Sequence, residues 1–185
     1  MSAGDARPAR LPGDPTPREA LARMLRVDHA GEHGAVRIYD GQLAVLGRAP
    51  EGDAIRRMRA QEQAHLDEFD RLLPAHQVRP TLLGPLWHVA GFALGAAGAA
   101  LGPKAAMAVT VAVEEVIDEH YAAQIARLGP ESGQLRATLE RFRRDEIAHR
   151  DEGIAHGAAD APAHALLSAA VKAGSRLAIW LSTRI

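Results

Sequence analysis

The chain of 185 residues contains no cysteine, which excludes disulfide bonds, iron–sulfur clusters and zinc–thiolate sites. Aromatic residues make up only 4% of it, and alternating β-branched runs are scarce, so a β-sheet core is disfavoured. The 22 basic and 23 acidic residues give a formal net charge of −1, without the basic excess of a nucleic-acid-binding protein. Long stretches rich in Ala, Leu, Val, Arg and Glu remain, and they predict an all-α protein. Any metal must bind through nitrogen and oxygen, which suits iron or manganese and leaves zinc open.

The chain is short enough to form one domain behind a short leader. Residues 1–17 contain four prolines among charged and small residues, without the apolar run of a secretory signal. We therefore expect a disordered leader over residues 1–17 and a single domain over residues 18–185. This leader does not resemble an amphipathic transit helix, which favours a bacterial-type cytosolic chain.

The chain carries two copies of one pattern, a glutamate followed some thirty residues later by Glu-x-x-His. The spacing between the two glutamates is 30 residues in the first copy and 32 in the second. Because residues i and i+3 share a helix face, each Glu-x-x-His presents a carboxylate and an imidazole in one direction. This is the ligand pattern of a di-iron or di-manganese centre in a ferritin-like four-helix bundle. The predicted ligands are Glu32, Glu62, His65, Glu114, Glu146 and His149.

Helix-breaking residues lie midway between the two glutamates of each copy. Glycine and proline cluster at residues 47–52 in the first copy and at residues 129–133 in the second. If each copy is an antiparallel helical hairpin, ligands equidistant from the turn come level with each other. We therefore predict hairpins over residues 18–73 and 104–154.

Helical periodicity distinguishes Glu114 from its neighbour Glu115. Apolar and small residues recur at intervals of three and four from Met107 to Leu128, and Glu114 falls on that stripe. Glu115 lies 100° away around the helix and is expected at the periphery. Tyr121 returns to the same stripe, either as a catalytic residue beside His120 or as an ordinary core tyrosine.

A ligating imidazole normally donates its second N–H to a nearby acceptor. Asp28 and Asp118 each lie four residues from a predicted ligand, and we expect the acceptors at these positions.

Two further segments are rich in apolar residues. Residues 81–113 carry no formal charge before Lys104, and three interpretations stay open for them. They form a buried core helix, a short membrane span, or a hydrophobic hairpin that enters one leaflet or faces a lipid-like ligand. The final helix, over residues 163–185, places basic side chains beside Trp180 and several leucines, which fits either a membrane interface or a cap on the bundle.

Several strings of this chain are distinctive. They are Arg26–Glu32 with Ile38-Tyr39, Thr110–Glu115 with His120-Tyr121 and Gln124-Ile125, Phe142-Arg143, Asp145-Glu146 and His149, and residues 173–179. In these strings the chain resembles demethoxyubiquinone hydroxylases. The resemblance covers residues 23–185, with one departure at His33, where a tyrosine is commoner.

The resemblance implies a di-iron monooxygenase that uses O₂ to hydroxylate the ring of a polyprenylated demethoxyubiquinol. It implies that the six predicted ligands hold two Fe²⁺ ions, with Glu62 and Glu146 bridging. These two glutamates, His120 and Tyr121 are the expected catalytic residues, and NADH is the expected reductant. The resemblance also implies a peripheral protein on the cytoplasmic face of a bacterial cell membrane. Other ubiquinone-biosynthesis proteins or further copies of the chain are candidate partners.

Three other functions are compatible with the same residues. Another membrane-associated di-iron quinol oxidase would reduce O₂ to water and leave the ring unaltered. A ferritin-like iron-handling protein would need no apolar route to the metals. A lipid-binding helical scaffold would bind no metal at all.

Overall fold

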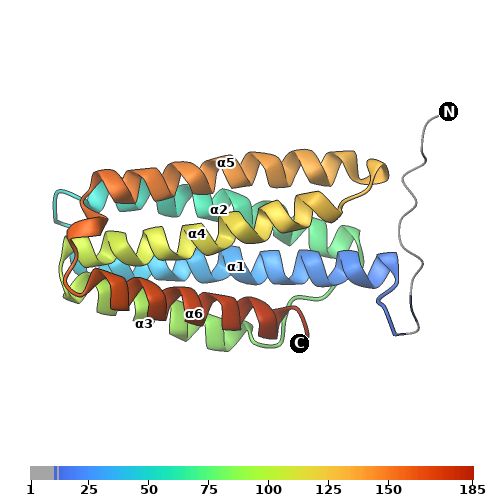
Figure 1. Ribbon diagram of the computed structural model, residues 1–185, viewed down its shortest axis with the longest axis horizontal. Coiled ribbons are helices and arrows are strands. Elements are labelled where there is room, and N and C mark those ends of the chain that lie inside the picture. The colour runs from blue at the N-terminus through green and yellow to red at the C-terminus, as the bar shows by residue number, and fades with distance from the viewer. Residues whose placement is uncertain (1–10, 12) are drawn as a thin grey trace.

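The computed structural model describes residue 11 and residues 13–185, and within these residues helices are the only regular secondary structure. The predicted leader therefore lies largely outside the described residues. Six α-helices follow one another in the chain, joined by short loops and two single 3₁₀ turns (Figure 1). The helices are α1 Pro17–Leu46, α2 Gly52–Ala75, α3 Gly84–Ala100, α4 Pro103–Arg127, α5 Gly133–Ala155 and α6 His164–Ser182; the 3₁₀ turns are η1 Pro130–Ser132 and η2 Ala158–Asp160.

The two predicted hairpins are present, α1 with α2 and α4 with α5, and together they form the four-helix bundle. Helix α1 starts with a capping box, in which Thr16 accepts from the backbone N–H of Glu19 and the Glu19 side chain accepts from that of Thr16. It ends beside Gly47, at the cluster of helix breakers that predicted the turn. The all-α, ferritin-like fold predicted from the sequence is thus confirmed.

Two apolar clusters of the bundle core lie on either side of a polar layer. One cluster lies toward the α1–α2 turn and contains Tyr39, Ile55 and Met107. The other lies toward the α4–α5 turn and contains Phe69 and Leu139. Along all four bundle helices the predicted metal ligands fall between these clusters, so apolar packing closes the layer from both ends.

Helix α3 packs closely on the outside of α1 through small residues. A Cβ atom at Gly95 would lie 1.9 Å from the backbone oxygen of Ile38, and one at Gly91 would lie 2.9 Å from that of Gly34. Gly41 of α1 would meet α3 in the same way, at 2.1 Å from the oxygen of Phe92. The glycines of this segment therefore permit two backbones to approach one another.

The outer face of α3 is apolar and exposed, so α3 is not a buried core helix. Leu86 and Val89 keep 52% and 65% of their surface, and Leu82 before the helix keeps 69%. Among the described helices, none is both long enough and apolar enough to cross a bilayer. The buried-helix interpretation is therefore wrong for α3, whereas residues 105–113 of the same segment belong to α4 and are buried in the bundle as it expected. The membrane-span interpretation finds no support.

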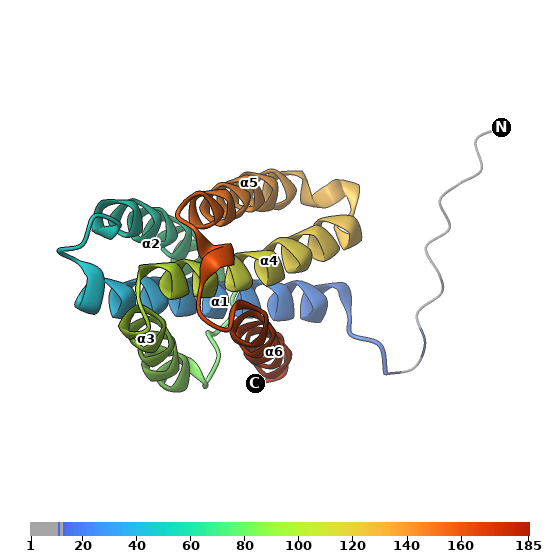
Figure 2. The same cartoon turned by 60° about the vertical axis from the view of Figure 1, so that its left-hand side comes forward.

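Helix α6 lies on the same side of the bundle as α3, opposite α2 and α5 (Figures 1 and 2). Trp87 of α3 donates from Nε1 to Oγ of Ser182 at 2.9 Å, which joins the two helices at one end. Lys172 pairs with Glu115 of α4 at 2.5 Å, so Glu115 is peripheral as the periodicity predicted. The exposed face of α6 carries Trp180, together with Leu166 and Leu177.

The α1–α3 packing predicts the effect of adding one methyl group. Gly95→Ala should lower the free energy of unfolding by about 1–3 kcal/mol, because the backbones must separate to admit the Cβ. Gly174→Ala in α6 is the matched control, since nothing lies within 4 Å of its Cβ position. That change should be neutral or stabilise by up to about 1 kcal/mol through helix propensity. Urea denaturation of the metal-free variants measures both, and equal effects would contradict the close-packing interpretation.

Candidate metal centre

The six predicted ligands come together in the polar layer of the bundle. They form two groups in which one ligand atom from each residue lies within 4.8 Å of the others. The first group is Glu32, Glu62, His65 and Glu146, and the second is Glu62, Glu114, Glu146 and His149. Glu62 and Glu146 belong to both groups, so the arrangement offers two neighbouring metal positions that share two carboxylates.

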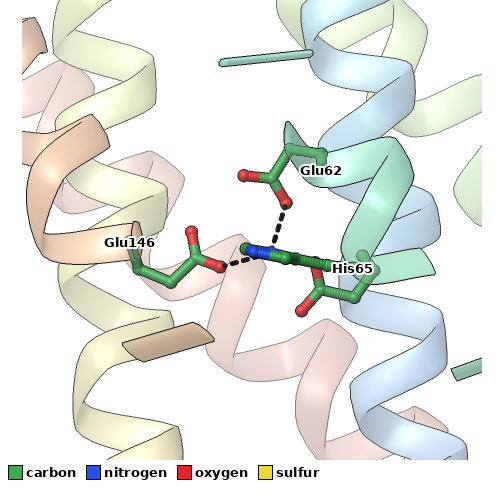
Figure 3. Close-up of side chains that lie close together, drawn as sticks. Glu62, His65 and Glu146 are labelled. Atoms are coloured by element: carbon green, nitrogen blue, oxygen red, sulfur yellow. Dashed lines mark ion pairs between the residues drawn. The ribbon is translucent and has the colours of Figure 1, made fainter. Parts of the chain in front are cut away.

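Each Glu-x-x-His presents both side chains to the interior, as its spacing predicted. Figure 3 shows the His65 ring between the carboxylates of Glu62 and Glu146. Nδ1 of His65 lies 3.2 Å from Oε1 of Glu146 and 3.9 Å from Oε2 of Glu62. Nδ1 of His149 lies 2.8 Å from Oε1 of Glu62 and 3.4 Å from Oε2 of Glu146. The same ring nitrogen thus faces the carboxylates in both motifs.

Unpartnered buried atoms test whether this site fits metal ions. Thirteen buried side-chain nitrogen and oxygen atoms of the described residues have no hydrogen-bond partner, and eight of them belong to the six predicted ligands. A buried polar atom without a partner is costly, and metal coordination satisfies such atoms. Four carboxylates also balance the charge of two divalent cations, which lowers the cost of burying both. The donor set of oxygen and imidazole nitrogen therefore fits iron or manganese.

Two buried tyrosines hold the glutamates that are not shared between the groups. Tyr39 of α1 donates to Oε1 of Glu114 across the bundle at 2.8 Å. Tyr121 of α4 donates to Oε1 of Glu32 in the reciprocal direction. In each glutamate the other oxygen, Oε2, is left without a partner. The tyrosines therefore fix the carboxylates and leave one oxygen of each toward the centre.

The acceptors of the two imidazoles differ from those predicted. Nε2 of His65 lies 3.1 Å from Oδ2 of Asp145, and Nε2 of His149 lies 3.2 Å from Oε1 of Gln61. Asp28 and Asp118 are engaged elsewhere, so the expectation for them is wrong. Both partners come from a different helix than the imidazole they meet, and four-residue spacing within one helix could not reveal them.

Asp28 and Asp118 have other roles. Asp28 accepts from Nε2 of Gln124 at 2.6 Å and lies 3.2 Å from Nε2 of His120. Asp118 accepts from Arg143 at 2.6 Å. His120 thus lies outside both metal groups, whereas its neighbour Tyr121 contacts Glu32 directly.

Burial and mutual repulsion perturb the carboxyl groups strongly. Burial, reinforced by the charge of Glu146, raises the pKa of Glu62 well above its usual range. Burial also raises the pKa of Glu114 and of Glu146 itself. Burial opposes the charge of His65 as well, but the neighbouring carboxylates of Glu146 and Glu32 raise its pKa to about 10. Without metal the centre therefore retains protons, and metal binding must release them, so metal affinity falls as pH falls.

Tyr39, Asp145 and Gln61 were not among the predicted site residues. Tyr39 had an available signal, because it follows Glu32 by seven residues as Tyr121 follows Glu114. Asp145 and Gln61 share a weaker signal, since each directly precedes the glutamate of a Glu-x-x-His.

The four-helix bundle and its paired carboxylate–imidazole groups are those of the ferritin-like class of proteins, and they are compatible with a centre of two metal ions. Residues 19–182 match the family of ubiquinone biosynthesis protein COQ7. The chain therefore belongs to the COQ7 family, in agreement with the resemblance seen in the sequence.

Relatives of the chain span bacteria and eukaryotes. It is 60% identical over 177 residues to 3-demethoxyubiquinol 3-hydroxylase of Rhodospirillum rubrum, covering 95% of this chain and 84% of that protein. It is 51% identical over 172 residues to the human mitochondrial NADPH-dependent 3-demethoxyubiquinone 3-hydroxylase, covering 91% and 79%. It is 40% identical over 182 residues to the mitochondrial 5-demethoxyubiquinone hydroxylase of Saccharomyces cerevisiae, covering 89% and 78%.

The shared carboxylates predict which substitutions remove metal. Glu62→Ala or Glu146→Ala should lower the metal content from about two ions per chain to nearly none, because both positions lose a ligand. Glu115→Ala should retain both ions, since that side chain pairs with Lys172 at the surface. Metal analysis of protein purified after iron loading measures these three variants together with Glu114→Ala. Loss of metal in Glu115→Ala, with retention in Glu114→Ala, would contradict the ligand assignment.

Proposed function

We propose that this protein hydroxylates the ring of a polyprenylated demethoxyubiquinol with O₂ at a centre of two iron ions. Membership of the COQ7 family and the names of the relatives, all demethoxyubiquinol or demethoxyubiquinone hydroxylases, support the reaction. The requirement for metal rests on one observation. Eight ligand atoms without a hydrogen-bond partner converge in two groups that share Glu62 and Glu146.

The overall reaction sets what the centre must supply. One oxygen atom of O₂ replaces a ring hydrogen as a hydroxyl group, and the other leaves as water with two protons and two electrons from a reductant. Two bound iron ions would supply the electrons for O₂ activation and be reduced again between turnovers. The names of the mitochondrial relatives include NADPH dependence, which supports a reduced nicotinamide nucleotide, NADH or NADPH, as the external donor here.

The protein's own side chains hold this chemistry in place and keep water away. The six ligands are at least 97% buried, and apolar clusters close the layer on both sides. The reciprocal bonds from Tyr39 and Tyr121 keep Glu114 and Glu32 in position before metal binds. Such preorganisation reduces the rearrangement needed during the reaction.

His120 and Asp28 suit the supply of protons from outside. The side chain of His120 is 22% exposed, whereas that of its partner Asp28 is fully buried. Gln124 links the two, and the neighbouring Tyr121 reaches Glu32. In our proposal His120 passes a proton from the surface to Asp28, which lies near Tyr121 and Glu32.

An isotope experiment tests the proposed reaction. Under ¹⁸O₂ the iron-loaded protein should convert a short-tailed demethoxyubiquinol to a product with one ¹⁸O atom in the new hydroxyl group on its ring. Glu146→Ala, which removes a shared ligand, should give no labelled ring, and Glu115→Ala should give the wild-type product. Mass spectrometry of the quinone measures both. If O₂ is consumed while the ring stays unlabelled, the protein is a quinol oxidase instead.

We further propose that α3 and α6 rest on one leaflet of a membrane, on the cytoplasmic face in a bacterial cell. Both helices expose apolar side chains on the same side of the bundle. Lys172 and Arg176 already pair with Glu115 and Glu119, so apolar contact rather than basic charge should dominate the attachment. A substrate with an isoprenoid tail would reach the protein from that surface.

Vesicle binding tests this orientation. Changing Leu177 and Trp180 together to Asp should weaken co-sedimentation with phospholipid vesicles at least tenfold, because two exposed apolar anchors become charged. Ile154→Asp is the control, since this residue is also 52% exposed but belongs to α5, a helix on the opposite side of the bundle. Equal loss of binding in both proteins, or in neither, would contradict the proposed membrane face.

A further inference from the structure

The two halves of the metal centre are related by regular offsets in the sequence, one for each pair of equivalent helices. The pairs Glu32 and Glu114, Tyr39 and Tyr121, and Gln42 and Gln124 are each 82 residues apart. The pairs Glu62 and Glu146, and His65 and His149, are each 84 residues apart. Helices α1 and α4 therefore carry equivalent side chains, and so do α2 and α5.

Contacts in the structure follow the same equivalence. Tyr39 donates to Glu114, and Tyr121 donates to Glu32, so the two bonds exchange roles. Gln42 donates to Oγ1 of Thr110 at 3.2 Å, and Gln124 donates to Asp28 at 2.6 Å. The centre thus has an approximate two-fold arrangement of side chains.

The imidazole acceptors break this arrangement most directly. Asp145 and Gln61 are equivalent positions, 84 residues apart, and each meets the imidazole of the other half. The acceptor for His65 is a carboxylate, whereas the acceptor for His149 is a neutral amide. Nδ1 of both rings faces the glutamates, so a cation bound there would leave the hydrogen on Nε2, toward each acceptor.

Two other differences fall on the His65 side as well. Phe142 stacks on the His65 ring at 3.9 Å between centroids, while the equivalent residue, 84 positions earlier, is Met58. Asp28, near Tyr121 and Glu32, is equivalent to Thr110 in the other half. Carboxyl groups are therefore concentrated around one of the two positions.

We propose that the two metal positions are inequivalent, and that Asp145 and Gln61 make the position at His65 the tighter one, filled first. A carboxylate acceptor makes the imidazole more basic and holds its orientation, and it adds negative charge near the cation. A neutral amide holds the orientation alone. Asp145 and Gln61 act through the imidazoles and are positioning residues. This inference rests on the proposed dinuclear centre.

The order of filling should be visible with Co²⁺, which has a visible spectrum that reports its ligands. Anaerobic titration of the metal-free protein should show two binding steps, the first tighter than the second by about 10- to 100-fold. Asp145→Asn should weaken the first step by about that factor and leave the second step unchanged. Gln61→Glu should tighten the second step, by adding the carboxylate that the His149 side lacks.

The double variant Asp145→Asn with Gln61→Glu locates the ions. Anomalous diffraction from crystals with one equivalent of Co²⁺ should place the ion beside His65 in the wild type and beside His149 in the double variant. Glu140→Gln removes one charge from an exposed site of the same helix α5 and should change neither step. Circular dichroism of the metal-free variants checks that each is folded, and Gln61→Glu serves as an independent test if Asp145→Asn is not.

The outcomes separate the two proposals. Two equal steps in the wild type, or equal weakening of both by Asp145→Asn, would overturn the inequivalence while leaving a dinuclear centre intact. Failure of the wild-type protein to bind any Co²⁺ in this layer would overturn both.

Discussion

The burial of four glutamates in one interior is the constraint on which this structure depends. Glu62 and Glu146 have no measurable exposure, and Glu32 and Glu114 have 2% or less. Their mutual repulsion and the cost of burial would oppose folding of the ionised site unless protons or cations neutralise them. Several carboxylate oxygens are available to cations, because they have no hydrogen-bond partner. These are Oε2 of Glu32 and Glu114 and both oxygens of Glu62 and Glu146.

The rest of the bundle holds these four glutamates at the same height along the helices. Turns at equal distances from the ligands bring the two hairpins into register, and apolar clusters above and below exclude water. Tyr39 donates to Oε1 of Glu114 and Tyr121 donates to Oε1 of Glu32, which fixes both carboxylates without neutralising them. The proposed function also requires a surface outside the bundle that an apolar substrate can contact. An apolar substrate needs a route to the buried layer, and α3 and α6 supply an exposed apolar face beside the bundle.

Local patterns in the sequence were enough to predict the fold. The i, i+3 spacing, the central turns and the helical stripe that selects Glu114 over Glu115 all act within one helix or one hairpin. The convergence of the six predicted ligands follows from the same periodicity, although their coordination of metal stays a prediction. The acceptors Asp145 and Gln61 could not be predicted this way, because each depends on how α2 and α5 face each other, across 80 and 88 residues of sequence. Composition also could not show which side of α3 faces the bundle, since glycines and leucines are both apolar in such a segment.

The most direct measurement of the dinuclear centre is anomalous diffraction at the iron edge from crystals of iron-loaded protein. Two peaks about 3.5–4 Å apart are expected between Glu62 and Glu146, one beside Nδ1 of His65 and the other beside Nδ1 of His149. A single peak, or iron bound away from these carboxylates, would contradict the assignment of the centre.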